Sequence, residues 1–102
     1  MATIKFTKDN FEAEALKSDV PVLIDFYADW CGPCRMVSPI VEQIANEGGN
    51  YKVGTIDVDS SPELAARYGV MSIPTLIVLK DGKVAQQAVG ARSKQQILQM
   101  LQ

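Results

Sequence analysis

The chain has 102 residues, 47% of them hydrophobic, which is typical of one globular domain that buries a core without disulfide or metal staples. Its formal net charge of −2 and its scattered basic residues exclude the concentrated positive surface that nucleic-acid binding requires. No apolar segment approaches the roughly 20 residues of a membrane helix, because Asp25 and Pro74 interrupt the two most hydrophobic segments.

The first predicted elements are a short strand at residues 3–6 and a helix at residues 10–17. Residues 1–6 lack the charged, apolar and small-residue regions of a signal peptide, so we expect a cytoplasmic protein. Residues 20–28 form a nearly continuous apolar run rich in β-branched and aromatic side chains, the pattern of a strand buried on both faces. We therefore expect this strand at the centre of a sheet.

The apolar spacing then becomes helical over residues 32–47, and Gly48 and Gly49 end this predicted helix. Pro39 lies inside it and is expected to kink it. Residues 51–58 form the next predicted strand, so strand, helix and strand make a βαβ unit, which requires a parallel pair of strands. The apolar positions of the helix are Met36, Val37, Ile40, Val41 and Ile44.

A second, shorter helix is predicted at residues 61–68. Ser61 is expected to cap it, and Pro62 suits its first turn because that position needs no N–H donor. This helix precedes the last part of the sheet.

Residues 76–80 and 83–89 are predicted strands separated only by Asp81 and Gly82, a strong signal for a two-residue hairpin. Ser93 then begins a last predicted helix, in which it is the cap. The elements together predict an α/β fold with a central mixed β-sheet and helices on both of its faces. No linker or repeat divides the chain, so we expect one domain over residues 1–102.

Two cysteines, Cys31 and Cys34, stand where the buried strand ends and the long helix begins, with Gly32 and Pro33 between them. Cysteines at this spacing at a helix start have Cα atoms close enough for a disulfide, about 4.4–6.8 Å. The free N–H groups and the positive end of the helix dipole stabilise an anion, so we expect a stabilised thiolate at Cys31. In a reducing cytoplasm such a pair is more often catalytic or metal-binding than structural.

Two other roles for the cysteine pair are weaker. A structural disulfide that closes a four-residue loop adds only about 2 kcal/mol in the chain-entropy model, and a core of this size does not need it. A structural zinc site needs four ligands, and this chain offers two thiolates and no histidine, so we expect no metal. A pair that opens and closes as a redox centre is the interpretation that its strand-to-helix position favours.

The segment from Asp25 to Arg35 closely resembles the active site of the thioredoxin family, and the resemblance extends over essentially the whole chain. It includes the following further segments: Pro39; Tyr68-Gly69-Val70; Ile73-Pro74-Thr75; Asp81-Gly82; and Val89-Gly90-Ala91. The resemblance implies a thioredoxin fold and a protein-disulfide reductase.

In this family, by resemblance, Cys31 is the more exposed sulfur and attacks a substrate disulfide, and Cys34 resolves the mixed disulfide. The resemblance also implies disulfide-containing protein substrates and a flavin-containing thioredoxin reductase that draws electrons from NADPH. The chain itself shows no cofactor motif, so NADPH and flavin are expected only in the partner. We expect a monomer that binds neither nucleic acid nor membrane.

Asp25 is unusual because it is a carboxylic acid within the strand predicted to be buried. It could be tolerated beside a small wet gap. It could instead exchange a proton near Cys34, with desolvation raising its pKa, and the family resemblance supports this role. The family commonly has a lysine on the strand that faces this aspartate, where this chain has Thr55, which cannot supply the positive charge of the usual ion pair.

Trp30, the only tryptophan, directly precedes Cys31. It could fill the core, but its place beside a reactive thiol favours a position along the substrate groove. Tyr27 and Arg35 stand where the family more often has tryptophan and lysine, and each keeps the general character of its position.

Other expected groove residues follow from the resemblance alone. About 5–6% of X–Pro bonds are cis in folded proteins, so the sequence by itself predicts a trans bond at Pro74. The family match implies a cis bond facing the cysteines, with the Ile73 backbone free to pair with an extended substrate. The match also places Val89, Gly90 and Ala91 on the rim of the same apolar groove.

Two rival functions remain. The same fold supports disulfide oxidases and isomerases, but oxidising members commonly carry a histidine between the cysteines, whereas Gly32 and Pro33 resemble the reducing type. The other rival is a binding module that holds a partner without turnover, which intact cysteines make at most a secondary role.

Overall fold

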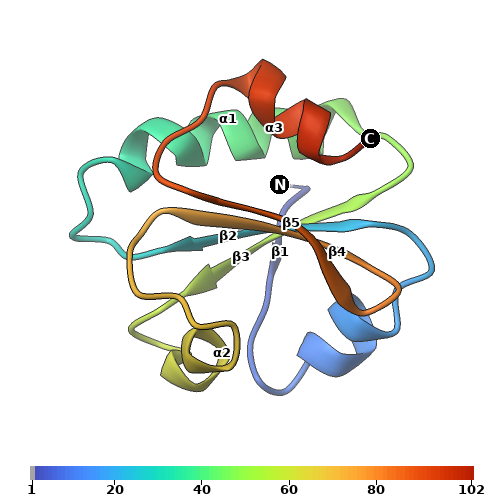
Figure 1. Cartoon of the computed structure of the whole chain (residues 1–102), viewed down its shortest axis with the longest axis horizontal. Coiled ribbons are helices and arrows are strands. Elements are labelled where there is room, and N and C mark those ends of the chain that lie inside the picture. Colours follow the sequence, from blue (N-terminus) through green and yellow to red (C-terminus); the bar gives the residue numbers. More distant parts are fainter. Residues whose placement is uncertain (1) are drawn as a thin grey trace.

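A computed structural model describes residues 2–102 and contains a five-stranded mixed sheet with the strand order β1-β3-β2-β4-β5 (Figure 1). β1 and β2 both run parallel to β3, whereas β4 runs antiparallel to both β2 and β5. The predicted α/β architecture is therefore confirmed. The strands are β1 (Ile4–Lys5), β2 (Val22–Tyr27), β3 (Lys52–Asp57), β4 (Thr75–Lys80) and β5 (Lys83–Val89).

The helices cover both faces of this sheet, as the sequence predicted. Figure 1 shows α1 and α3 on one face, and α2 and the N-terminal helical turn on the other. The helical elements are η1 (Glu12–Leu16), α1 (Cys34–Glu47), α2 (Pro62–Arg67) and α3 (Lys94–Met100).

β2 occupies the centre of the sheet because its side chains are apolar on both faces. Ile24 and Phe26 point into one core layer, where they pack with residues of η1 and α2. Leu23 points into the other layer, with Val37 and Val41 of α1. The alternation of side chains along a strand therefore assigns Asp25, two residues after Leu23, to the α1 face.

Several sequence signals produce the expected local structure. Asp81 and Gly82 have φ angles of 53° and 76°, and such left-handed values at both positions join two strands with the correct twist. Ser93 caps α3 through a complete capping box, in which its hydroxyl accepts from the Gln96 N–H and the Gln96 side chain accepts from the Ser93 N–H. Pro39 lies inside α1, which continues beyond it as one helix.

Two local expectations were wrong, and one element is shorter than expected. Ser61 directly precedes α2 but its side chain makes no capping hydrogen bond, because its φ and ψ of −129° and 62° differ from the extended backbone that the cap of α3 adopts. Met36, assigned to the apolar face of α1, is 70% exposed because it lies across the helix from the buried Cys34. The first predicted helix is present but shorter than residues 10–17: η1 is a single π-type turn, in which the Lys17 N–H donates to the carbonyl of Glu12.

Candidate active site

Cys31 and Cys34 form a disulfide in the connection between β2 and α1, with their Cα atoms 5.3 Å apart. This separation lies inside the range that a disulfide accommodates. Cys31 and Cys34 are 4% and 2% exposed, so the predicted difference in exposure is small in this oxidised form. Both pack with Ala28 in a small apolar cluster at the end of β2.

The backbone N–H of Cys34 donates to Cys31 Sγ at 3.2 Å. Cys34 is the first residue of α1, so this donor belongs to the positive end of the helix dipole. After reduction, the same N–H is placed to stabilise a thiolate on Cys31. Gly32 and Pro33 between the cysteines are exposed, and beyond its chain neighbours no atom lies within 4 Å of a Cβ added at Gly32.

A second loop, the one before β4, also reaches Cys31. The carbonyl oxygen of Ile73 lies 3.7 Å from Cys31 Sγ, although the two residues are far apart in sequence. The peptide bond between Ile73 and Pro74 is cis, as the family resemblance implied. The Gly90 N–H donates to the Pro74 carbonyl at 2.8 Å, which joins the loop after β5 to this loop.

Figure 1 shows these segments at one end of the sheet, on the left of the view: the loop before α1, the loop before β4 and the loop after β5. The structure thus brings together most of the residues that the sequence pointed to. On the rim, Val89 and Ala91 are exposed beside Gly90, whose φ of 93° suits a glycine.

Trp30 is 68% exposed, which excludes the core-filling role and leaves its indole on the surface beside the cysteines. Its Nε1–H donates to the carboxylate of Asp59 at 2.8 Å. Asp59 follows β3, and its own N–H donates to the Asp57 carboxylate at 2.9 Å. Nothing in the sequence singles out Asp59, because only the fold brings the end of β3 beside Trp30.

Arg35 is also exposed, and its guanidinium donates to the carbonyl of Asp29 at 3.1 Å. This bond holds a positive charge beside the loop that carries Trp30. Met71, which was not predicted to take part, is 96% exposed two residues before Ile73. Trp30 and Val89 are exposed apolar side chains too, and all three residues lie next to or within two residues of Cys31, Ile73 or Gly90 in the sequence.

Asp25 is fully buried, and within residues 2–102 neither of its carboxylate oxygens has a hydrogen-bond partner. Burial raises the pKa of Asp25 from 3.8 to about 7, since desolvation disfavours the charged form. Thr55 lies directly opposite Asp25 on β3 and shares its face of the sheet. The position where the family commonly has a lysine is therefore the neighbour of Asp25 and carries no charge.

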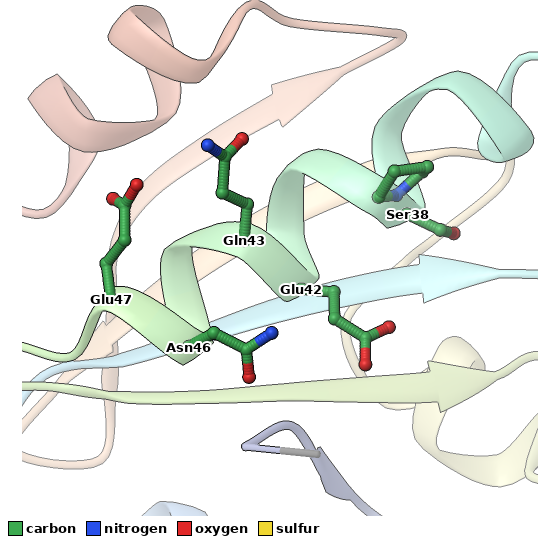
Figure 2. Close-up of a pocket in the computed structure, with 6 residues that line it drawn as sticks. Ser38, Glu42, Gln43, Asn46 and Glu47 are labelled. Atoms are coloured by element: carbon green, nitrogen blue, oxygen red, sulfur yellow. The ribbon is translucent and has the colours of Figure 1, made fainter.

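A small pocket reaches Cys34 from the side of α1. It is lined by Tyr27, Ala28, Asp29, Cys34, Arg35, Ser38 and Pro39. A larger, shallow depression lies further along the outer face of α1 (Figure 2). Figure 2 shows Gln43 and Glu47 on one side of the helix and Glu42 and Asn46 on the other. Because all its lining residues come from one helix and none is a cysteine, this depression is not part of the redox site.

The described part of the chain contains no group of three or more His, Cys, Asp or Glu side chains that could hold a metal ion. Among the same residues, no helix has both the length and the apolar character needed to cross a membrane.

Comparison with known proteins supports a redox role for this site. A family model described as thioredoxin matches residues 2–102. A thioredoxin of Streptomyces clavuligerus is 50% identical over 92 residues, covering 90% of this chain and 86% of that protein. Thioredoxins of Mycobacterium tuberculosis (strain ATCC 25618 / H37Rv) and Bacillus subtilis (strain 168) are 48% and 47% identical, over 98% and 99% of this chain and 87% and 96% of those proteins.

Proposed function

The chain belongs to the thioredoxin family, and on this premise we propose that it reduces protein disulfides with Cys31 as nucleophile and Cys34 as resolving thiol. It is a thiol-disulfide oxidoreductase with a redox-active cysteine pair. The observation that carries the assignment of roles is the Cys34 N–H, which donates to Cys31 Sγ and so favours the thiolate at Cys31.

The reaction begins from the dithiol form. The Cys31 thiolate attacks one sulfur of the substrate disulfide, which forms a mixed disulfide and releases the first substrate thiolate. Cys34 then loses its proton and attacks Cys31 Sγ, which releases the second substrate thiolate and closes the Cys31–Cys34 disulfide. Two electrons pass to the substrate, and each released thiolate takes up one proton.

Asp25 is the proposed acceptor of the Cys34 proton. It lies on the face of the sheet that α1 covers, and Cys34 is the first residue of α1. A carboxyl group with a pKa of about 7 can accept and return a proton near neutral pH, whereas an ordinary aspartate is too weak a base.

The substrate is proposed to lie along the exposed apolar surface around Cys31, with the Ile73 backbone pairing with an extended segment beside its disulfide. The protein needs no bound cofactor for this step, since the electrons are stored in the two thiols. Thioredoxin reductase, which supplies electrons from NADPH through its flavin, is the proposed partner that restores the dithiol. A reducing compartment such as the cytoplasm suits this cycle.

The name thioredoxin, which the relatives share, favours a reductase over the oxidase and isomerase of the same fold. The test is insulin reduction coupled to NADPH oxidation by a thioredoxin reductase. We expect turnover with the wild-type protein and none with the double variant Cys31→Ser/Cys34→Ser. If the protein catalysed insulin reduction with dithiothreitol but not with the reductase, the proposed disulfide-reductase activity would stand and the proposed partner would be rejected.

A further inference from the structure

Three consecutive carbonyl groups beside the disulfide, those of Ser72, Ile73 and Pro74, have different partners. The Ser72 carbonyl accepts a hydrogen bond from Thr75 Oγ1 at 2.5 Å. The Pro74 carbonyl accepts from the Gly90 N–H at 2.8 Å. The middle carbonyl, that of Ile73, lies 3.7 Å from Cys31 Sγ. The two outer carbonyls are thus held by the protein, and the middle one faces the reactive sulfur.

Thr75 is a firm anchor for this loop. It is the first residue of β4 and is paired with Phe26 on β2 and Val89 on β5, so both neighbouring strands fix its backbone. Its side chain is β-branched, which restricts rotation about χ1. The residue is only 1% exposed, so water cannot replace the Ser72 carbonyl as the partner of its hydroxyl. If that carbonyl moved away, the hydroxyl would be buried without a hydrogen bond, which is costly.

We propose that Thr75 is a positioning residue for thiol-disulfide exchange: its hydroxyl holds the Ser72 carbonyl and thereby keeps the Ile73 backbone aligned with Cys31. This inference rests on the proposed function, because it assumes that a protein substrate docks against Ile73. Thr75 does not touch the reacting sulfur atoms. It acts through the loop, because a displaced Ile73 backbone would pair less well with an extended substrate segment and so bind that substrate more weakly.

The decisive comparison is Thr75→Ser with Thr75→Ala, because these two variants differ only in the hydroxyl group. Thr75→Val keeps the branched shape of threonine and removes the hydroxyl donor. Thr7→Val is the control, because it makes the same substitution in the connection between β1 and η1. Urea melts identify the variants that are folded. Steady-state rates are then measured with two probes: insulin, whose chain can lie along the loop, and 5,5′-dithiobis(2-nitrobenzoic acid), a small disulfide without a peptide chain.

We expect Thr75→Ala and Thr75→Val to raise the KM for insulin by about fivefold, the factor that corresponds to roughly 1 kcal/mol, the typical contribution of one hydrogen bond. Thr75→Ser and Thr7→Val should stay close to the wild type. All four variants should reduce the small disulfide at the wild-type rate, because that probe does not need the loop.

The proposal is overturned if Thr75→Ala retains the wild-type KM for insulin, or if Thr75→Ser is as impaired as Thr75→Ala. Equal losses with both probes would also overturn it, because they would indicate general damage to the site. A wild-type protein that fails to reduce insulin would instead reject the proposed function.

Discussion

Cys31 Sγ accepts a hydrogen bond from the first N–H of α1, whereas Cys34 lies within the helix and lines the pocket beside Tyr27 and Ser38. The two thiols differ little in residue exposure, at 4% and 2%. The hydrogen bond from the N-terminus of α1 to Cys31 Sγ, more than a difference in exposure, therefore supports Cys31 as the nucleophile. The sequence predicted this from the position of the pair, but not that both cysteines would be buried.

The pKa of Asp25 leads to a prediction about stability. Its folded pKa of about 7 lies above its ordinary value of 3.8, so the unfolded chain releases the proton first as pH rises. The free energy of unfolding should therefore fall between about pH 4 and pH 7 and level off above that range. Asp25→Asn should remove this loss and stabilise the protein at about pH 8 by at most about 4 kcal/mol, with little gain near pH 4.

Urea melts of the wild type and Asp25→Asn at the two pH values measure this difference, and the release of a trapped mixed disulfide measures the catalytic role. We expect slower release in Asp25→Asn. Thr55→Lys is the matched variant, because an ammonium group opposite Asp25 should lower its pKa and weaken the pH dependence. If Asp25→Asn and the wild type were equally stable at each pH value and released the mixed disulfide at the same rate, Asp25 would be a tolerated residue with no part in the reaction.

Trp30 should report the redox state of the pair. It is the only tryptophan, it precedes Cys31, and its indole is held by Asp59. A disulfide next to the indole should change its emission, so reduction by dithiothreitol should alter the fluorescence spectrum. Asp59→Asn should alter this response, because it weakens the charge-assisted bond to Nε1–H. Identical spectra before and after a reduction verified by mass spectrometry would contradict this placement of Trp30.

At the scale of elements, the sequence predicted best where one local signal decides the structure. The apolar run of β2, the left-handed turn at Asp81 and Gly82 and the capping box at Ser93 are all such cases. Ser61 shows the limit of this reasoning, because the same residue type before a helix makes no capping bond. Whether a serine caps depends on the backbone angles that the surrounding fold imposes, which periodicity does not reveal.

The two serines make a matched test. Ser93→Ala should reduce the free energy of unfolding by about 1 kcal/mol, since it removes the hydroxyl that satisfies the Gln96 N–H at the start of α3. Ser61→Ala should cost less, because no capping bond is lost in α2. Urea melts under identical conditions compare the two variants. A larger loss in Ser61→Ala than in Ser93→Ala would contradict the assignment of the caps.

At the scale of the whole molecule, the site depends on connections that only the folded chain shows. Ile73 meets Cys31, Gly90 meets Pro74, and Asp59 meets Trp30, in each case between segments separated by many residues. The family resemblance predicted that Ile73, Pro74 and Gly90 share a groove. It did not indicate the role of Asp59, because a hydrogen bond between segments distant in sequence leaves no periodic pattern. Nor did it indicate the role of Thr75, whose bond to Ser72 is local but lies beside Cys31 only in the folded chain.

The central claim is that Cys31 attacks the substrate and Cys34 resolves the product, and trapping of the mixed disulfide tests it most directly. Reduced Cys34→Ser and Cys31→Ser proteins are each incubated with insulin, and the adducts are mapped by mass spectrometry of intact protein and peptides. We predict that Cys34→Ser accumulates an insulin chain bonded to Cys31, since no second thiol releases it, and that Cys31→Ser accumulates little. An adduct on Cys34 of the Cys31→Ser protein, with none on Cys31 of the Cys34→Ser protein, would contradict the account.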